Sequence, residues 1–391
     1  MHRSSNLKKL VSVTKVAYKI IQIKYLKKKL PIFGSADITN FCNLKCKHCY
    51  WWLNRRPHKE LSADEWRNVV REKFIKNDVM SISLTGGEPL LRPDVIEAIL
   101  SEMKWRYVTI VTNGTLPLID FGTGYFISID GIESIHNAIR GIGTYRKVKQ
   151  NVLNHPEVDV VINMTINSLN YKCVEDVANE WYSFARALTF QFHTPFSSDD
   201  KLWLPYGKLR NNTIDKLLKI KEKYPDFIAN TSKQLNLFRD GKWTANCPKW
   251  FFVNLDSNGK TKQPCVISST DENGIKPICE RCGIACYAGA YSGLFLSDTE
   301  WLRMFKVAKR VAPFKNKAGW FQGIEGQKKN GSPNKHVKSE DGWWVLRGVV
   351  RLRLRSSKKG SLEERKEDTR TFTGSPSRRL ESNFRTYLGA L

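Results

Sequence analysis

Residues 41–51, FCNLKCKHCYW, bring Cys42, Cys46 and Cys49 together in one short stretch. Three thiols cannot pair among themselves in disulfides, and structural zinc sites are closed by four ligands. A C-x3-C-x2-C triplet placed after a strand therefore favours an iron–sulfur cluster with one iron left open to another ligand. Structural zinc is the alternative.

Composition indicates a globular protein with basic ends. The chain has 391 residues, 41% of them hydrophobic, and a formal net charge of +26. Residues 1–31 contain nine Lys or Arg and no acidic residue, and residues 315–391 contain 18 basic and 8 acidic residues. No apolar run approaches the ~20 residues that a membrane span requires, and lysines interrupt any signal-like segment. We therefore expect a cytoplasmic protein with one large core.

Strand-like and helix-like segments alternate between residues 35 and 195. Ser62 and Glu65 have capping-box spacing at the start of a predicted helix over 61–76, and apolar residues recur with helical spacing over 93–105. Predicted buried strands cover residues 35–40, 78–85, 106–114, 125–131, 158–167 and 188–196. About six β/α units predict an α/β fold, a partial (β/α)6 TIM-like barrel with a small cysteine-rich C-terminal extension. The active site is expected at the carboxyl ends of the strands.

The second predicted strand ends in the turn LTGGEPLL, residues 84–91. Gly86 and Gly87 allow the backbone to approach a ligand closely, and the Glu88 carboxylate can accept hydrogen bonds from an ammonium group. With the cysteine triplet, this turn resembles the radical S-adenosylmethionine (SAM) superfamily. Its markers are C-x3-C-x-aromatic-C after the first strand and Gly-Gly-Glu-Pro after the second, and the resemblance covers roughly residues 34–290.

The resemblance implies two cofactors, a [4Fe–4S] cluster and SAM. Cys42, Cys46 and Cys49 would bind three irons, and the fourth iron would bind the amino and carboxylate groups of SAM. His48 stands at the family's aromatic position, beside the adenine. Such enzymes cleave SAM reductively to a 5′-deoxyadenosyl radical, which modifies a C–H or C=C position of a substrate, and an electron donor such as ferredoxin or flavodoxin is implied.

Residues at the ends of the later strands would complete the SAM pocket. The resemblance places Gly86, Gly87 and Glu88 at the methionine ammonium, Ser128 and Asp130 at the ribose, and Arg140 at the methionine carboxylate. Asn113, Thr165 and Asn167 are further candidates for this pocket. For these three, a plain turn or strand-end role is the alternative, since Asn favours turns without any ligand.

A second cysteine group follows the predicted barrel and consists of Cys247, Cys265, Cys279, Cys282 and Cys286. Its C-x2-C-x3-C ending resembles an auxiliary iron–sulfur site of the SPASM or twitch type. One auxiliary [4Fe–4S] cluster is predicted, with the last four of these thiols as ligands and Cys247 as a substitute or a spare. Structural zinc on the same four thiols is the alternative. Cys173 stands apart and is predicted to be a small core residue.

These features divide the chain into four parts: a basic amphipathic helix over 1–33, the radical SAM core over 34–235, the auxiliary-cluster region over 236–292, and a basic, partly disordered tail over 293–391. The N-terminal helix either lies on an anionic membrane, at its inner face, or packs on the barrel. A basic helix before the barrel also resembles lipid-modifying, adenosylhopane synthase-like members of the superfamily.

Several substrates and one other class of protein stay open at this point. A membrane lipid is the leading substrate, and a peptide, a protein or a cofactor precursor is the alternative. The other class is a basic module that binds zinc through its cysteines and nucleic acid through its ends. A zinc module has no need of the Gly-Gly-Glu-Pro turn, so we favour the enzyme and do not expect a nucleic acid partner.

Overall fold

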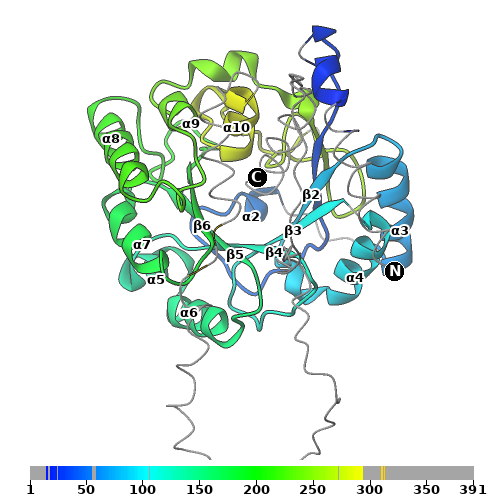
Figure 1. Cartoon of the computed structure of the whole chain (residues 1–391), viewed down its shortest axis with the longest axis horizontal. Helices are drawn as coiled ribbons and strands as arrows, with labels where there is room; N and C mark the ends of the chain where they lie inside the picture. The colour runs from blue at the N-terminus through cyan, green and yellow to red at the C-terminus, as the bar shows by residue number, and fades with distance from the viewer. Residues whose placement is uncertain are drawn as a thin grey trace, which may run out of the picture.

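The computed structural model describes residues 15, 18–23, 25–54, 59–104, 106–271, 273–293, 310 and 312. Seven strands form one sheet in the order β6-β5-β4-β3-β2-β1-β7, and every neighbouring pair is parallel. The sheet curves, and most of the helices cover its outer side (Figure 1). The predicted α/β partial barrel is therefore confirmed.

The elements follow the predicted alternation. The strands are β1 (Phe33–Asp37), β2 (Ser81–Thr85), β3 (Tyr107–Thr112), β4 (Gly124–Ser128), β5 (Val160–Ile166), β6 (Ala187–Phe192) and β7 (Phe252–Leu255). The helices are α2 (Tyr50–Asn54), α3 (Ala63–Val70), α4 (Pro93–Met103), α5 (Glu133–Arg140), α6 (Thr144–Asn154), α7 (Val174–Trp181), α8 (Lys208–Lys223), α9 (Ser232–Leu237) and α10 (Ala285–Gly293). Six of these strands match the predicted strand segments.

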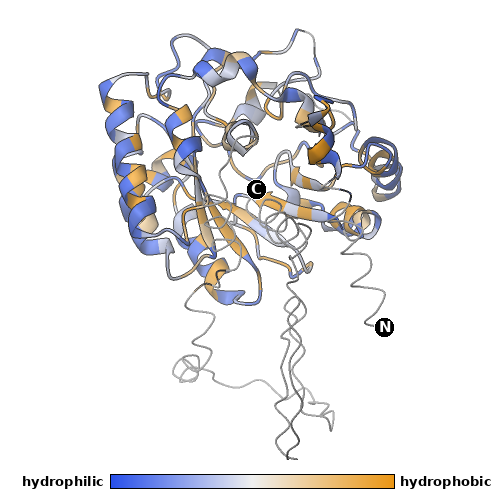
Figure 2. Cartoon of the chain, turned by 45° about the horizontal axis from the view of Figure 1, so that its top comes forward, coloured by the Kyte–Doolittle hydropathy of each residue, from blue (hydrophilic) through white to orange (hydrophobic). Residues whose placement is uncertain are grey.

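The helices pack on the sheet through apolar faces, as Figure 2 shows by the orange inner sides of the outer helices. Helix α3 begins at the predicted capping box, in which the Ser62 side chain accepts from the Glu65 amide and the Glu65 carboxylate accepts from the Ser62 amide. Trp66 on α3 and Ile96 on α4 are completely buried. Capping fixes where α3 starts, and burial of its apolar stripe holds it on the sheet.

The seventh strand was not predicted. Residues 252–255 lie within the segment assigned to the auxiliary-cluster region, yet β7 pairs in parallel with β1, with Phe252 opposite Phe33 and Leu255 opposite Ala36. A run of four residues is too short for periodicity to distinguish a strand from a buried turn. This pairing brings the second cysteine group back to the edge of the sheet beside the first. The division of the chain into four parts stays a prediction.

A buried ion pair joins the same two regions. Lys262 Nζ lies 2.5 Å from Asp37 Oδ2 and also donates to the Val266 carbonyl, and both charged side chains are at most 2% exposed. The other carboxylate oxygen accepts from Thr85 Oγ1 at 2.7 Å. Asp37 ends β1, and Lys262 lies in the loop between β7 and Cys265. This loop therefore cannot move away from the barrel without leaving one of the two charges without its partner.

The N-terminal segment contacts the barrel where it is described. Lys19 is buried, and its ammonium group donates to the carbonyl oxygens of Pro31, Asn77 and Asp78. This contact supports the packing alternative, while the membrane contact stays a prediction. Within the described residues, no helix has the length and apolar character needed to cross a membrane. The predicted tail lies almost wholly outside the described residues.

We predict that Lys262→Met lowers the free energy of unfolding by about 3–5 kcal/mol, because it leaves the buried Asp37 carboxylate without its counter-charge. Urea unfolding at pH 7 measures the change. Lys260→Met is the matched control, since Lys260 is exposed. The double change Asp37→Asn with Lys262→Met should recover a large part of the loss. A loss below 1 kcal/mol for Lys262→Met would contradict the role of the ion pair.

Candidate active site

The first cysteine triplet lies in the loop that leads from β1 into α2. Cys42, Cys46 and Cys49 all line one cavity of about 350 Å³, which extends from the interior of the barrel to the carboxyl ends of its strands. Two backbone hydrogen bonds hold this loop. Cys49 N donates to the Cys46 carbonyl at 3.1 Å, and Lys47 N donates to the Ile139 carbonyl at 2.9 Å. The structure thus brings the three predicted ligands together around one space.

Burial keeps these thiols protonated when no metal is bound. It raises the pKa of Cys42 to about 11, and it also raises the pKa of Cys46 and of Cys49. A metal binds the thiolate, so cluster binding would release these protons. Arg140 Nη1 lies 3.8 Å from Cys46 Sγ, which supplies positive charge beside one thiolate.

The Gly-Gly turn packs against the cysteine loop. Gly86 has a φ of +114°, and a Cβ at Gly87 would lie 2.0 Å from the Phe41 carbonyl oxygen. The amide of Gly87 donates to the Thr39 carbonyl at 2.9 Å. Both glycines line the cavity, as predicted, but their absent side chains are needed first for this backbone contact. The turn therefore fixes the height of the cysteine loop above the sheet.

Glu88 lies beneath the cavity and does not line it. Its side chain is 1% exposed, and its carboxylate accepts from Thr112 Oγ1 at 2.7 Å, from Asn113 N at 2.8 Å and from Leu90 N at 3.1 Å. These bonds hold the end of β3 against the turn that follows β2. The sequence indicated a carboxylate at this point, whereas its three protein partners follow from the tertiary structure. Its contact with SAM stays a prediction.

Asp130 joins the fourth strand to the cysteine loop. Its buried carboxylate accepts from Arg140 Nε at 2.5 Å and from Thr165 N at 3.0 Å, and His48 Nε2 lies 3.5 Å away. Burial by itself would raise the pKa of Asp130, but Arg140 and His48 lower it below its ordinary value. Burial lowers the pKa of His48 to about 4, so its ring is neutral near pH 7. A neutral ring suits the predicted place beside an adenine.

The remaining predicted contacts divide into two groups. Asn113, Ser128 and Thr165 line the cavity, together with Arg140 and His48. Asn113 Nδ2 lies 4.0 Å from Cys42 Sγ and donates to Asn43 at 2.8 Å. Asn167 does not line the cavity, and its side chain accepts from the Leu169 amide in a local turn. Asn167 therefore has the turn role that was the alternative to contact with SAM.

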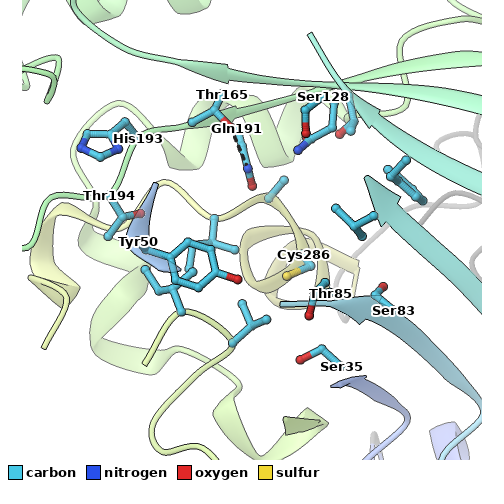
Figure 3. Close-up of a pocket in the computed structure, with 18 of the residues that line it drawn as sticks. Ser35, Tyr50, Ser83, Thr85, Ser128, Thr165, Gln191, His193, Thr194 and Cys286 are labelled. Carbon is cyan, nitrogen blue, oxygen red and sulfur yellow. Dashed lines mark hydrogen bonds between the residues drawn. The ribbon is translucent and has the colours of Figure 1, made fainter. Parts of the chain in front are cut away.

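Sequence reasoning missed the polar interior of the barrel. Small hydroxyl and amide side chains line the cavity from several strands: Ser35, Ser81, Ser83, Thr85, Asn163, Thr189, Gln191 and Asn254. Strand residues two apart face the same side, so polar residues at alternate positions in otherwise apolar strands were a readable signal. Tyr50 and His193 line the cavity as well, and Figure 3 shows both of them with Thr165 and Gln191.

The second cysteine group gathers around Cys265, which is buried. Burial is the main cause that raises the pKa values of Cys247 and Cys286 to about 12, and the charge of Cys265 is the second cause for both. Cys265 contributes in the same direction at Cys279 and at Cys282. The structure thus places all five predicted thiols near one another. Cys173, by contrast, is a buried core residue that stands apart from both groups, as expected.

The second group also closes the open side of the barrel. A Cβ at Gly283 would lie 2.1 Å from the Phe192 carbonyl oxygen, and the amide of Phe192 donates to the Gly283 carbonyl at 2.9 Å. The segment with Cys279 and Cys282 therefore lies against the end of β6, while β7 adds to the opposite edge of the sheet. One cysteine-rich segment connects both edges.

The thiols of the described residues do not converge on a single metal ion. In the described part of the chain, no three His, Cys, Asp or Glu side chains are close enough to hold one metal ion. A [4Fe–4S] cluster does not need such convergence, because each thiolate binds a different iron. Three neighbouring thiols around a cavity that leaves room for a further ligand fit a cluster with one open iron.

Known proteins share this combination of motifs. Residues 37–180 match the family model described as the radical SAM superfamily. This segment of the chain is a radical SAM domain. Such a domain calls for a [4Fe–4S] cluster and SAM as cofactors, and it favours the enzyme over the nucleic-acid-binding module.

Individual relatives match over part of their length. The sporulation killing factor maturation protein SkfB of Bacillus subtilis is 30% identical, over 39% of this chain and 40% of its own length. A probable GTP 3′,8-cyclase of Archaeoglobus fulgidus is 30% identical, over 39% of this chain and 55% of its own. SuiB of Streptococcus suis, bound to the precursor peptide SuiA, is 18% identical with a TM-score of 0.49, covering 71% of each chain. The chain therefore spans less than two thirds of the length of each of these two curated relatives.

We predict that changing Cys42, Cys46 and Cys49 together to Ala removes about half of the iron from a protein that otherwise binds about eight irons in two clusters. Anaerobic reconstitution followed by iron and zinc analysis measures this. Cys173→Ala is the control, since Cys173 is buried and belongs to neither cysteine group. Stoichiometric zinc with no uptake of iron would instead establish the zinc alternative.

We also predict that Glu88→Gln lowers the free energy of unfolding by about 1–3 kcal/mol, because the amide nitrogen must face an N–H or O–H donor. SAM affinity should fall as well, since β3 and the Gly-Gly turn lose their shared acceptor. Denaturant unfolding and calorimetric titration with SAM measure the two effects. Glu97→Gln on the exposed side of α4 is the control. Stability and affinity equal to the wild type would contradict the assignment.

Proposed function

We propose that this protein is a radical SAM enzyme that modifies a peptide or a protein. The observation that carries the proposal is the charge of the cavity. Among the described residues that line it, Arg140 is the only Lys, Arg, Asp or Glu, and its guanidinium is already paired with Asp130. A neutral cavity with hydroxyl and amide side chains suits a neutral peptide segment, whose amides need hydrogen-bond partners.

A nucleoside triphosphate is the second candidate, because one relative is a probable GTP 3′,8-cyclase. Proteins bind phosphate groups through clusters of Arg and Lys or through helix N-termini. The single paired arginine of this cavity does not provide such a cluster. Peptide modification is therefore favoured over GTP cyclisation.

The earlier preference for a lipid substrate is replaced. It depended on the basic N-terminal segment, and Lys19 in that segment is engaged with backbone carbonyls of the barrel. The similarity to a killing factor maturation protein of Bacillus subtilis supports a peptide or protein substrate instead. Membrane contact and the identity of the electron donor stay predictions.

The bound cofactors would supply the radical chemistry that breaks an unactivated C–H bond, and the chain supplies binding, orientation and shielding. Cys42, Cys46 and Cys49 would hold the cluster, with Arg140 beside the thiolate of Cys46. His48 would pack against the adenine as a neutral ring, held by Asp130. The partial barrel and the cysteine-rich segment would shield a reactive substrate in the cavity from side reactions with water.

The test is formation of 5′-deoxyadenosine by reconstituted, reduced protein with SAM. Three additions are compared: a small-peptide fraction from the source cells, a lipid extract from the same cells, and GTP. We predict that the peptide fraction raises the rate several-fold over the rate without addition, and that protease treatment of this fraction abolishes the increase. Stimulation by GTP or by the lipid extract, with none by peptides, would replace the proposed substrate. No 5′-deoxyadenosine in any arm would contradict the enzyme itself.

A further inference from the structure

Cys286 differs from the other four thiols of its group in one respect: it faces the cavity. Of the five, only Cys286 is among the described residues that line it. The sequence predicted Cys286 as a ligand of the auxiliary cluster and Cys247 as a substitute or a spare. The place of Cys286 in the cavity wall favours the opposite assignment.

The orientation follows from helix α10. Ala285, Cys286, Gly289 and Ser292 all line the cavity. Residues three and four apart lie on one face of a helix, so α10 turns one face toward the barrel interior and Cys286 belongs to that face. Cys279 and Cys282 precede the helix, in the segment that packs on the end of β6. Cys279 and Cys282, which precede the helix, therefore lie in other surroundings than Cys286 on its inner face.

The surroundings of Cys286 are those of a ligand site. Figure 3 shows its sulfur beside the ring of Tyr50 in the cavity. Tyr50 is partly buried and lines the cavity, and its hydroxyl has no hydrogen-bond partner in the described part of the chain. His48 lines the same cavity with a side chain that is 10% exposed, and its buried Nδ1 has no partner among the described residues. Both groups are available to a bound molecule.

The other four thiols form a complete set without Cys286. Cys282 lies near Cys265, Cys247 and Cys279, whose charges add to burial in raising its pKa. Cys247 in turn lies near Cys265 and Cys279. Four thiolates are the usual complement of a closed [4Fe–4S] cluster. Cys286 is also close in space to Cys265 and Cys247. Proximity by itself therefore does not separate it from the other four thiols.

We propose that Cys286 is a free thiol that contacts the substrate in the cavity, and that Cys247, Cys265, Cys279 and Cys282 bind the auxiliary cluster. This inference rests on the proposed function, because it requires the second cluster. Cys286 lies with Tyr50 on the wall between the two cysteine groups, since Tyr50 follows Cys49 directly and also lies near Cys265. A substrate in the cavity would therefore meet a thiol and a phenol hydroxyl.

The test alkylates the reconstituted full-length protein anaerobically with iodoacetamide, a small neutral probe, and maps the modified cysteines by mass spectrometry. Because burial raises the pKa of Cys286 to about 12, the reaction is run at about pH 9 and followed over hours. We expect slow modification of Cys286 while the iron content stays at about eight per chain. Iron content is measured in parallel for two variants. Cys286→Ala should keep all of its iron, whereas Cys247→Ala should lose about half.

Three results would overturn the proposal: Cys286 modified only after iron is chelated, loss of about half of the iron in Cys286→Ala, or full retention of iron in Cys247→Ala. Cys282→Ala is the control, because Cys282 is a ligand in either set and its loss should remove about half of the iron. A wild-type protein with about four irons would contradict the second cluster alone, and one with no iron would contradict the function proposed above. Either result is distinguished from failure of the Cys286 assignment, in which the wild type keeps about eight irons.

Discussion

The buried pair of Asp37 and Lys262 is the interaction on which the arrangement of the site depends. A charged side chain that is 2% exposed or less is stable only when it is paired and hydrogen-bonded. Asp37 ends the first strand, just before the first cysteine loop, and Lys262 precedes Cys265 by three residues. The cost of separating the two charges fixes the second cysteine group against the first, and it confines a cavity between them.

The cysteine-rich segment also covers the two open edges of the sheet. Strand β7 adds to one edge, beside β1, and the Gly283 turn pairs with the end of β6 at the other. Helix α10 lies between these attachments and turns Cys286 toward the interior. The same segment therefore supplies thiols, closes the barrel and lines the cavity, so changes in it are expected to affect all three together.

Much of the fold was predictable because its signals are local. Capping at Ser62, the apolar stripe of α4 and six buried runs identified their elements without tertiary information. Strand β7 was missed because its four residues carry no period. At the site, the cysteine triplet and the Gly-Gly-Glu-Pro turn identified the chemistry. The sequence did not show that the Glu88 carboxylate lies beneath the cavity and accepts from two backbone amides and the Thr112 hydroxyl. Motifs indicate which residue types a site uses and leave their partners open.

By itself, the sequence determined that this chain contains a radical SAM domain and a second cysteine group, because spacing within a loop or turn is a local property. Only the tertiary structure decided that the cavity is neutral, that Asp37 meets Lys262 across 225 positions, and that Cys286 faces inward. Each of these depends on how distant segments approach one another. Strand pairing and the burial of charge set that approach, and neither can be read from the spacing of residues along the chain.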